Sequence, residues 1–181
     1  RSRTGISQRR ISGLSENVCE MGYKAAMAAI KMTKWDIDTL DLIILATSTP
    51  NDLFGSAPNI QSKLGAKNAV AFDLTAACSG FLFAVITASQ FLKSGSYKRA
   101  IIIGSDQLSS YVDWDDRRSC ILFGDGAGAI AIEATNEFDN LIGFSMRTDG
   151  KRGSFLNLPS QNTQDIIIDD INYLSGGFST I

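Results

Sequence analysis

Apolar residues recur along the chain with two different spacings, and these predict alternating helices and strands. Near the N-terminus they recur every three or four residues, which predicts an amphipathic helix over residues 15–33 with Ser15 as its N-cap. A proline shortly after Ser56 is typical of a helix start, so we expect a shorter helix over residues 56–64. Residues 79–93 are apolar on nearly all sides, which predicts a buried helix.

Continuous apolar runs between these helices predict strands that are covered on both faces. The predicted strands are residues 42–46, 69–74, 100–104, 120–123 and 127–132, with residues 141–146 and 165–168 as weaker candidates. Strands that alternate with helices predict an α/β fold with a mostly parallel sheet. We find no repeat and no interdomain linker, and therefore expect a single domain over residues 1–181.

Composition adds limits on the partners and the compartment. A hydrophobic content of 44% with 20% charged residues is typical of a soluble globular protein. A net charge of −2 gives no general attraction to nucleic acid or to membranes, and the longest apolar stretch, residues 81–92, is too short to cross a bilayer. Three cysteines without CxxC spacing argue against a disulfide framework or a zinc site, so we expect a cytoplasmic protein. Because the chain opens at Arg1 and stops after a Gly-Gly turn, we expect a fragment of a longer protein.

Cys78 is the main candidate for chemistry because of its place in the pattern. It follows the strand predicted over residues 69–74 and precedes the helix predicted over residues 79–93, among small residues. A helix N-terminus stabilises a thiolate over a thiol, and small neighbours leave room for an acyl group. The alternative is a small buried thiol, which is what most cysteines are. For Cys19, beside the apolar stripe of a helix, and for Cys120, in a predicted strand, we expect that structural role.

The chain contains no histidine, which excludes several kinds of catalytic site within it. A Ser-His-Asp triad, a Cys-His dyad and an HExxH zinc helix each need one. The glycine-rich residues 124–128 precede a predicted strand rather than a helix, so we interpret them as a tight turn and not as a nucleotide-binding loop. Arg117 and Arg118 follow two aspartates, which favours a self-neutralising surface loop. Arginine is also suited to stacking on adenine or gripping phosphate.

Several segments follow one another along the chain in an order shared with one enzyme family. They are Arg3-Thr4-Gly5-Ile6 with Arg9-Arg10-Ile11, Ala46 to Thr49, Phe72 to Phe81, Gly104-Ser105-Asp106, Asp116-Arg117, and Phe123 to Gly128. In these segments the chain resembles β-ketoacyl-acyl-carrier-protein synthase III along essentially its whole length. The resemblance implies a thiolase-like fold, with this chain as the N-terminal half of a duplicated α-β-α-β-α layered architecture.

The resemblance also implies a reaction. The family transfers an acyl group from acyl-CoA, such as acetyl-CoA, to a cysteine and condenses it with malonyl-acyl-carrier protein, losing carbon dioxide and initiating fatty-acid synthesis. Acyl-CoA is a substrate, so no cofactor is implied, and the enzyme is expected as a homodimer. Cys78 matches the acylated nucleophile. The other matched residues are Arg3 and Arg117 as CoA contacts, Ser48, Leu108 and Phe123 in the acyl pocket, and Phe54 as the aromatic that reaches across the dimer.

The chain departs from the family in what it lacks. The family's histidine and asparagine, which polarise the malonyl thioester and stabilise the enolate, belong to a C-terminal half that would follow Ile181. The first strand of the fold would precede Arg1. Two other functions stay open: another thiolase-fold acyltransferase, against which the Arg-Thr-Gly-Ile opening weighs, and a non-catalytic module that binds CoA or a carrier protein.

Overall fold

A computed structural model describes residues 4–117, 120–136 and 141–151 of the chain. The chain forms two compact units, Arg1–Ile142 and Gly143–Ile181. The helices and strands described below all lie in the first unit. The second unit is described only over residues 143–151.

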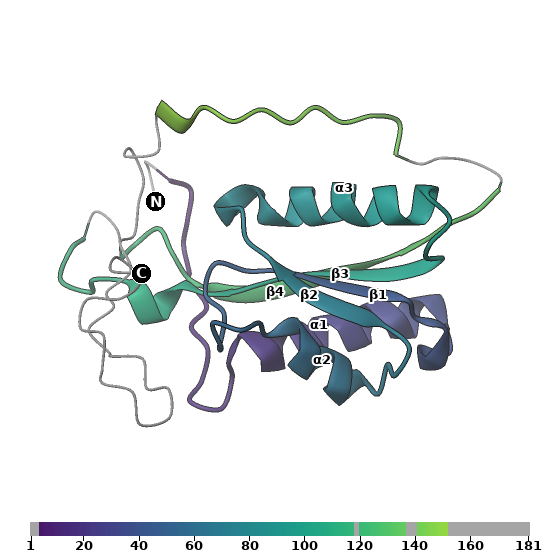
Figure 1. Ribbon diagram of the computed structural model, residues 1–181. Coiled ribbons are helices and arrows are strands. Elements are labelled where there is room, and N and C mark those ends of the chain that lie inside the picture. Colours follow the sequence, from purple (N-terminus) through teal and green to yellow (C-terminus); the bar gives the residue numbers. More distant parts are fainter. Residues whose placement is uncertain (1–3, 118–119, 137–140, 152–181) are drawn as a thin grey trace, which may run out of the picture. The chain divides into compact units, whose positions relative to one another are not determined.

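The centre of the first unit is a four-stranded sheet with the order β2-β1-β3-β4 (Figure 1). Its strands are β1 (Leu42–Ala46), β2 (Val70–Leu74), β3 (Arg99–Gln107) and β4 (Asp125–Glu133). β1 runs parallel to both β2 and β3, whereas β4 runs antiparallel to β3. The predicted α/β fold with a mostly parallel sheet is confirmed.

Helices cover both faces of this sheet (Figure 1). α1 (Val18–Thr33) and α2 (Ala57–Leu64) lie on one face, and α3 (Gly80–Lys93) lies on the other. Short 3-10 helices occupy Ile37–Thr39, Ala77–Ser79 and Leu108–Tyr111. In the described part of the chain, no helix has the length and apolarity needed to cross a membrane.

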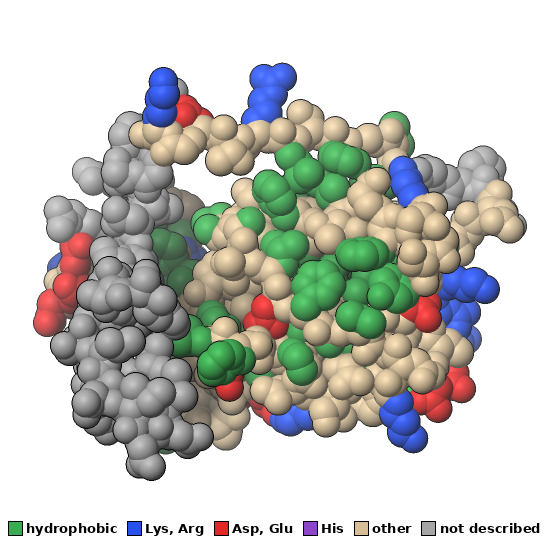
Figure 2. Space-filling view, viewed as in Figure 1, with side chains coloured by type: hydrophobic (Ala, Val, Ile, Leu, Met, Phe, Trp, Pro, Cys, Tyr) green, Lys and Arg blue, Asp and Glu red, His purple; other side chains and the backbone are tan. Residues whose placement is uncertain are grey.

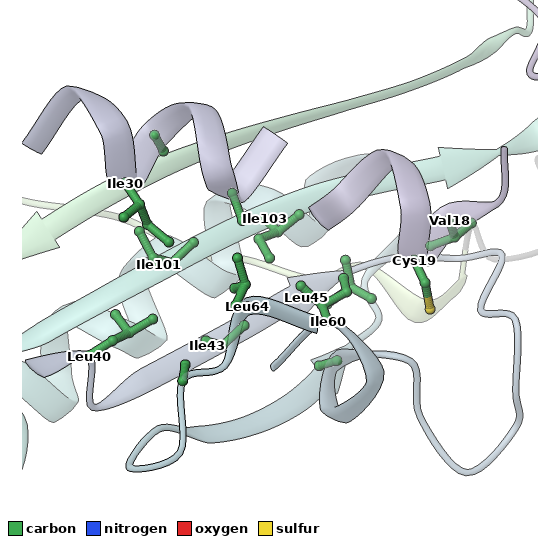
Figure 3. Packing of buried hydrophobic residues seen from close by; sticks show 14 residues of the cluster. Val18, Cys19, Ile30, Leu40, Ile43, Leu45, Ile60, Leu64, Ile101 and Ile103 are labelled. Carbon is green, nitrogen blue, oxygen red and sulfur yellow. The ribbon is translucent and has the colours of Figure 1, made fainter. Parts of the chain in front are cut away.

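The strands alternate their side chains between two apolar cores, which explains why their sequences are apolar throughout. Ile43, Leu45 and the corresponding isoleucines of β3 pack against α1 and α2 (Figure 3). Leu42 and Ile44 point to the other face and pack against α3. All five residues of β1 are buried, so this strand is the centre of both cores.

α3 is confirmed as a helix, but it is buried on one side only. Ala84, Ala88 and Leu92 face the sheet, whereas Leu82 is 66% exposed and Phe91 is 37% exposed. Figure 2 shows apolar side chains gathered over this part of the molecule. An all-round apolar helix predicts cover on both sides, and within the described residues of the first unit the sheet covers one side.

Several local predictions were wrong. α1 begins at Val18 rather than at residue 15, because the side chain of Asn17 caps it. Residues 120–123 form a turn, and residues 141–146 form no strand. The glycine-rich segment is not a tight turn, because β4 begins at Asp125 and runs through it. The strand predicted over residues 165–168 lies outside the described residues.

Candidate active site

The candidate site lies at one edge of the sheet, where the loops that connect to all four strands meet. The carboxyl ends of the parallel strands β1, β2 and β3 share this edge, and the antiparallel strand β4 begins there. Ser48 follows β1, Cys78 follows β2, Leu108 follows β3, and Phe123 precedes β4. In open α/β sheets, ligands bind outside the carboxyl ends of the strands. The topology therefore brings the predicted nucleophile and the predicted acyl-pocket residues to one edge.

Cys78 occupies the turn between β2 and α3. It is the middle residue of the 3-10 helix Ala77–Ser79, and α3 begins two residues later at Gly80. Its side chain is exposed. Ala77 has a φ of 46°, a left-handed conformation that non-glycine residues rarely adopt. The chain thus turns sharply at this point and presents the thiol to solvent at a helix N-terminus, which favours negative charge.

Asp106, at the end of β3, holds the segment that carries Ser48. Its Oδ1 accepts hydrogen bonds from the backbone N–H of Ser48 at 2.7 Å and from the hydroxyls of Thr47 at 3.2 Å and Thr49 at 3.3 Å. The Thr49 hydroxyl also accepts a bond from the N–H of Gln107 at 2.8 Å. The connection after β1 is therefore tied to the end of the neighbouring strand.

Asp73, in β2, holds the loop that carries Phe54. Its Oδ2 accepts a hydrogen bond from the N–H of Ser56 at 2.8 Å, and its Oδ1 accepts one from the N–H of Ala57 at 2.6 Å. The Ser56 hydroxyl in turn accepts a bond from the N–H of Asn51 at 2.9 Å. Phe54 is 99% exposed between these anchors, so the loop presents it outward rather than packing it against this chain.

An open hollow of about 580 Å³ lies beside these anchors. It is lined by Ser48, Phe54, Phe72 and Thr75, among other residues. Ser48 and Phe54 were both predicted as site residues, and here they line the same hollow. Within residues 4–117, 120–136 and 141–151, no group of three or more cysteine, histidine or acidic side chains could hold a metal ion.

Asp125, the first residue of β4, holds a third segment. Its carboxylate accepts hydrogen bonds from the N–H and hydroxyl groups of both Ser12 and Ser109, at 2.6–2.8 Å. Burial opposes ionisation of this carboxyl, but the hydrogen bonds from Ser109 and Ser12 outweigh it, so the pKa of Asp125 is lowered. Sequence reasoning missed Asp73, Asp106 and Asp125 as anchors, although each is an acidic residue within or at the end of a predicted strand or a matched segment.

The arginines predicted to contact CoA are less completely described. Arg117 lies exposed in the connection between β3 and β4, at the same sheet edge. Arg3 and Arg118 lie outside the described residues. Of the two arginines predicted to contact CoA, the structure therefore describes only Arg117, which lies in a connection at the same edge of the sheet as the candidate site.

The other two cysteines differ from Cys78. Cys19 lies in α1 and is buried in the hydrophobic core between the helices and the sheet. Its thiol lies 3.6 Å from the carbonyl oxygen of Ser56, and burial raises the pKa of this thiol. The predicted structural role of Cys19 fits this environment. Cys120 is half-buried in a turn, and its predicted strand is absent.

Comparison with known proteins connects this geometry to one family. The family model for 3-oxoacyl-[acyl-carrier-protein (ACP)] synthase III matches residues 72–150, which include Cys78, Leu108, Arg117 and Phe123. A β-ketoacyl-[acyl-carrier-protein] synthase III of Prochlorococcus marinus (strain MIT 9515) is 86% identical over all 181 residues. The chain is thus similar to β-ketoacyl-[acyl-carrier-protein] synthase III along its whole length. It covers 54% of that relative, so the chain spans about half the length of the synthase III relatives that it matches.

Solved synthase III structures show the same fold. The enzyme from Aquifex aeolicus VF5 is 45% identical, with a TM-score of 0.73 over 75% of this chain and 44% of that chain. The enzyme from Pseudomonas aeruginosa PAO1 is 31% identical, with a TM-score of 0.81 over 97% of this chain and 54% of that chain. Ser48 and Phe54 lie outside the family model's match but inside the alignment with the Prochlorococcus synthase III.

Proposed function

We propose that the chain is the acyl-accepting portion of a β-ketoacyl-[acyl-carrier-protein] synthase III. The observation that carries this proposal is the exposed Cys78 thiol at the start of α3, in a chain 86% identical to such an enzyme. The Cys78 thiolate attacks the thioester carbonyl of an acyl-CoA. A new C–S bond forms to Cys78, the bond to the CoA sulfur breaks, and the CoA thiolate leaves and takes up the proton that Cys78 lost.

The other matched residues would assist this acyl transfer. The backbone N–H of Cys78 would donate to the oxyanion of the tetrahedral intermediate and supply part of its stabilisation. Arg3 and Arg117 would contact CoA, and Ser48, Leu108 and Phe123 would line the space for the acyl chain. Their positions at one sheet edge support this assignment for the residues that the structure describes.

The complete reaction would then join the acyl group to malonyl-acyl-carrier protein, with loss of carbon dioxide, in the cytoplasm. In a homodimer, Phe54 would extend into the partner's site, and its almost complete exposure supports that role. Decarboxylative condensation in this family uses a histidine, and the 181 residues contain none. We therefore propose that the isolated chain accepts an acyl group but does not complete the condensation.

Covalent labelling tests the first step. The purified chain is incubated with acetyl-CoA and its intact mass is measured, with Cys78→Ala as the test variant and Cys120→Ala as the matched control. We expect one acetyl group on the wild type and on Cys120→Ala, and none on Cys78→Ala. A wild type that binds acetyl-CoA without any mass increase would indicate a non-catalytic binding module instead.

A condensation assay tests the second step. The chain is mixed with acetyl-CoA and malonyl-acyl-carrier protein, and the β-ketoacyl product is measured. We expect no product above the background without protein. Product formation by the isolated chain would contradict the proposal that the condensation needs groups which this chain lacks.

A further inference from the structure

Asp125 joins three segments that lie far apart in the sequence. Its Oδ2 accepts hydrogen bonds from the N–H and the hydroxyl of Ser12, both at 2.8 Å, and from the hydroxyl of Ser109 at 2.6 Å. Its Oδ1 accepts the N–H of Ser109 at 2.8 Å. A further bond at 2.6 Å runs from the side-chain amide of Gln107 to the Ser12 hydroxyl. One carboxylate thus fixes the segment before α1 against the end of β3.

The backbone around Asp125 is held as well. Its N–H donates to the carbonyl oxygen of Arg10 at 2.8 Å. A Cβ at Gly124 would come within 2.9 Å of that same oxygen, so the two segments lie in close contact there. Asp125 also pairs with Gln107 at the last position of the β3–β4 ladder. The segment before β4 therefore enters the sheet at a single defined position.

These bonds lie next to two residues assigned to the acyl pocket, Leu108 directly after β3 and Phe123 shortly before β4. Leu108 directly precedes Ser109, whose backbone and side chain both bond to Asp125. Phe123 lies two residues before Asp125 on the same strand entry. Both residues lie outside the strands, so the ladder alone does not fix the spacing between them. The carboxylate of Asp125 joins the residue after Leu108 to the strand that begins two residues after Phe123.

We propose that Asp125 is a positioning residue that fixes Leu108 relative to Phe123 and thereby sets which acyl chains Cys78 accepts. This inference rests on the proposed function. Discrimination of one methylene in an apolar pocket is typically about 10- to 200-fold, so a small change in wall spacing shows as a change in chain-length preference. In this proposal Asp125 does not contact the acyl group and acts only through the positions of Leu108 and Phe123.

Asp125→Asn tests the proposal because it keeps the shape and removes half of the acceptors. An amide has one accepting oxygen, so the N–H of Ser12 and the N–H of Ser109 no longer both find an acceptor atom in the present geometry. Asp41→Asn is the matched control. Asp41 accepts the N–H groups of Lys98 at 2.8 Å and Arg99 at 3.0 Å, at the opposite edge of the sheet.

The readout is the rate at which Cys78 gains an acyl group from acetyl-, butyryl-, hexanoyl- and octanoyl-CoA, measured by intact mass. We expect the ratio of the acetyl rate to the hexanoyl rate to change by about fivefold or more in Asp125→Asn. In Asp41→Asn the ratio should stay within about twofold of the wild type, whatever its effect on stability. Ser109→Ala, which removes one bond and keeps the N–H contact, should shift the ratio in the same direction by less.

The possible outcomes separate this inference from the proposed function. Acylation of all variants with an unchanged ratio would overturn the role of Asp125 and leave the function standing. A ratio that changes equally in Asp41→Asn would also overturn it, because the effect would then follow general destabilisation. If Asp125→Asn does not fold, Ser109→Ala decides in the same way. No acylation of the wild type would overturn the function and this inference with it.

Discussion

Ala77 holds the backbone in a left-handed conformation immediately before Cys78, with a φ of 46°. For a residue with a Cβ this conformation costs roughly 1–2 kcal/mol. The neighbouring structure maintains it, because β2 ends at Leu74 and α3 must begin at Gly80. This conformational cost arises in the turn that exposes the Cys78 thiol, so substitutions at Ala77 measure how much strain the turn contains.

We expect Ala77→Gly to leave the free energy of unfolding unchanged or to raise it by up to about 1 kcal/mol. Relief of strain exceeds or matches the extra chain entropy of glycine, which is roughly 0.5–1 kcal/mol. Ala77→Val should lower it by more than about 1 kcal/mol, since β-branched residues are outliers in this region. Chemical denaturation of the three proteins measures both effects. A valine variant as stable as the wild type would show that this turn is not strained.

The hydrogen bonds to Asp125 predict a dependence of stability on pH. Because the pKa of the folded-state carboxyl is lowered, its contribution is fully present above the ordinary value of 3.8 and is lost as the pH falls through the lower folded value. The difference in unfolding free energy between the wild type and Asp125→Asn should therefore be largest near pH 7 and shrink below about pH 4. Denaturation at several pH values measures it, and a constant difference down to pH 3 would contradict the assignment.

The sequence predicts the positions of some candidate site residues and not the contacts of others. The position of Cys78 at a strand-to-helix turn was predictable because the strand, the small residues and the helix around it are consecutive. The anchoring role of Asp125 was not, because its partner Ser12 lies 113 positions away. Asp106 and Ser48 are 58 positions apart, and only the parallel pairing of β1 with β3 brings them together. Contacts of this kind depend on the topology rather than on a local pattern.

Among the elements, α2 shows how one strand supports a helix. Ser56 stands at its N-cap but makes no side-chain capping bond to the helix. Asp73 of β2 supplies the acceptor instead, for the N–H groups of Ser56 and Ala57. Negative charge at a helix N-terminus is also favoured by the helix dipole. The strand that precedes Cys78 therefore also caps the helix after the loop of Phe54.

We expect Asp73→Ala to lower the free energy of unfolding by about 1–2 kcal/mol, the usual cost of losing a capping acceptor. It should also speed hydrogen exchange at the amides of Ser56 and Ala57, which lose their acceptor. Ser62→Ala, on the same helix, is a matched control, because it removes a side chain that contributes no capping bond at that end. Unchanged exchange at both amides would contradict the capping role of Asp73.

The elements were more predictable than the site. The central strands were found because helices cover both faces of the sheet, which makes each strand apolar throughout. The same criterion failed for residues 120–123, which are apolar but form a turn outside the sheet. It also did not show that β3 extends to Gln107, because its last residues are polar and serve as anchors at the site.

The surface of the described residues carries several large apolar side chains that are exposed. Leu82 and Phe91 of α3 are exposed, and so is Val70 of β2, at 47%. β2 is also an outermost strand of the described sheet, with a neighbouring strand on one side only. Exposed apolar patches and unpaired strand edges are typical sites of association.

We therefore expect the isolated chain to associate with itself as its concentration rises. Light scattering across a wide concentration range measures this, with Leu82→Lys as a variant that adds charge to the exposed face of α3. The variant should associate less than the wild type, and Lys24→Ala, on the opposite helix layer, should not. A wild type that stays monomeric at every concentration would contradict this expectation.

The end of the β3–β4 ladder has one more consequence. Because Gln107 and Asp125 are paired, the chain leaves the sheet and returns to it at neighbouring positions. Residues 108–124 therefore form a connection whose two ends are held side by side, and such a connection tolerates changes of length and sequence while the sheet stays as it is. New side chains at Leu108 and Phe123 would then change the part of the acyl pocket that this connection supplies without changing the sheet, provided that Asp125 and its partner Ser109 are retained.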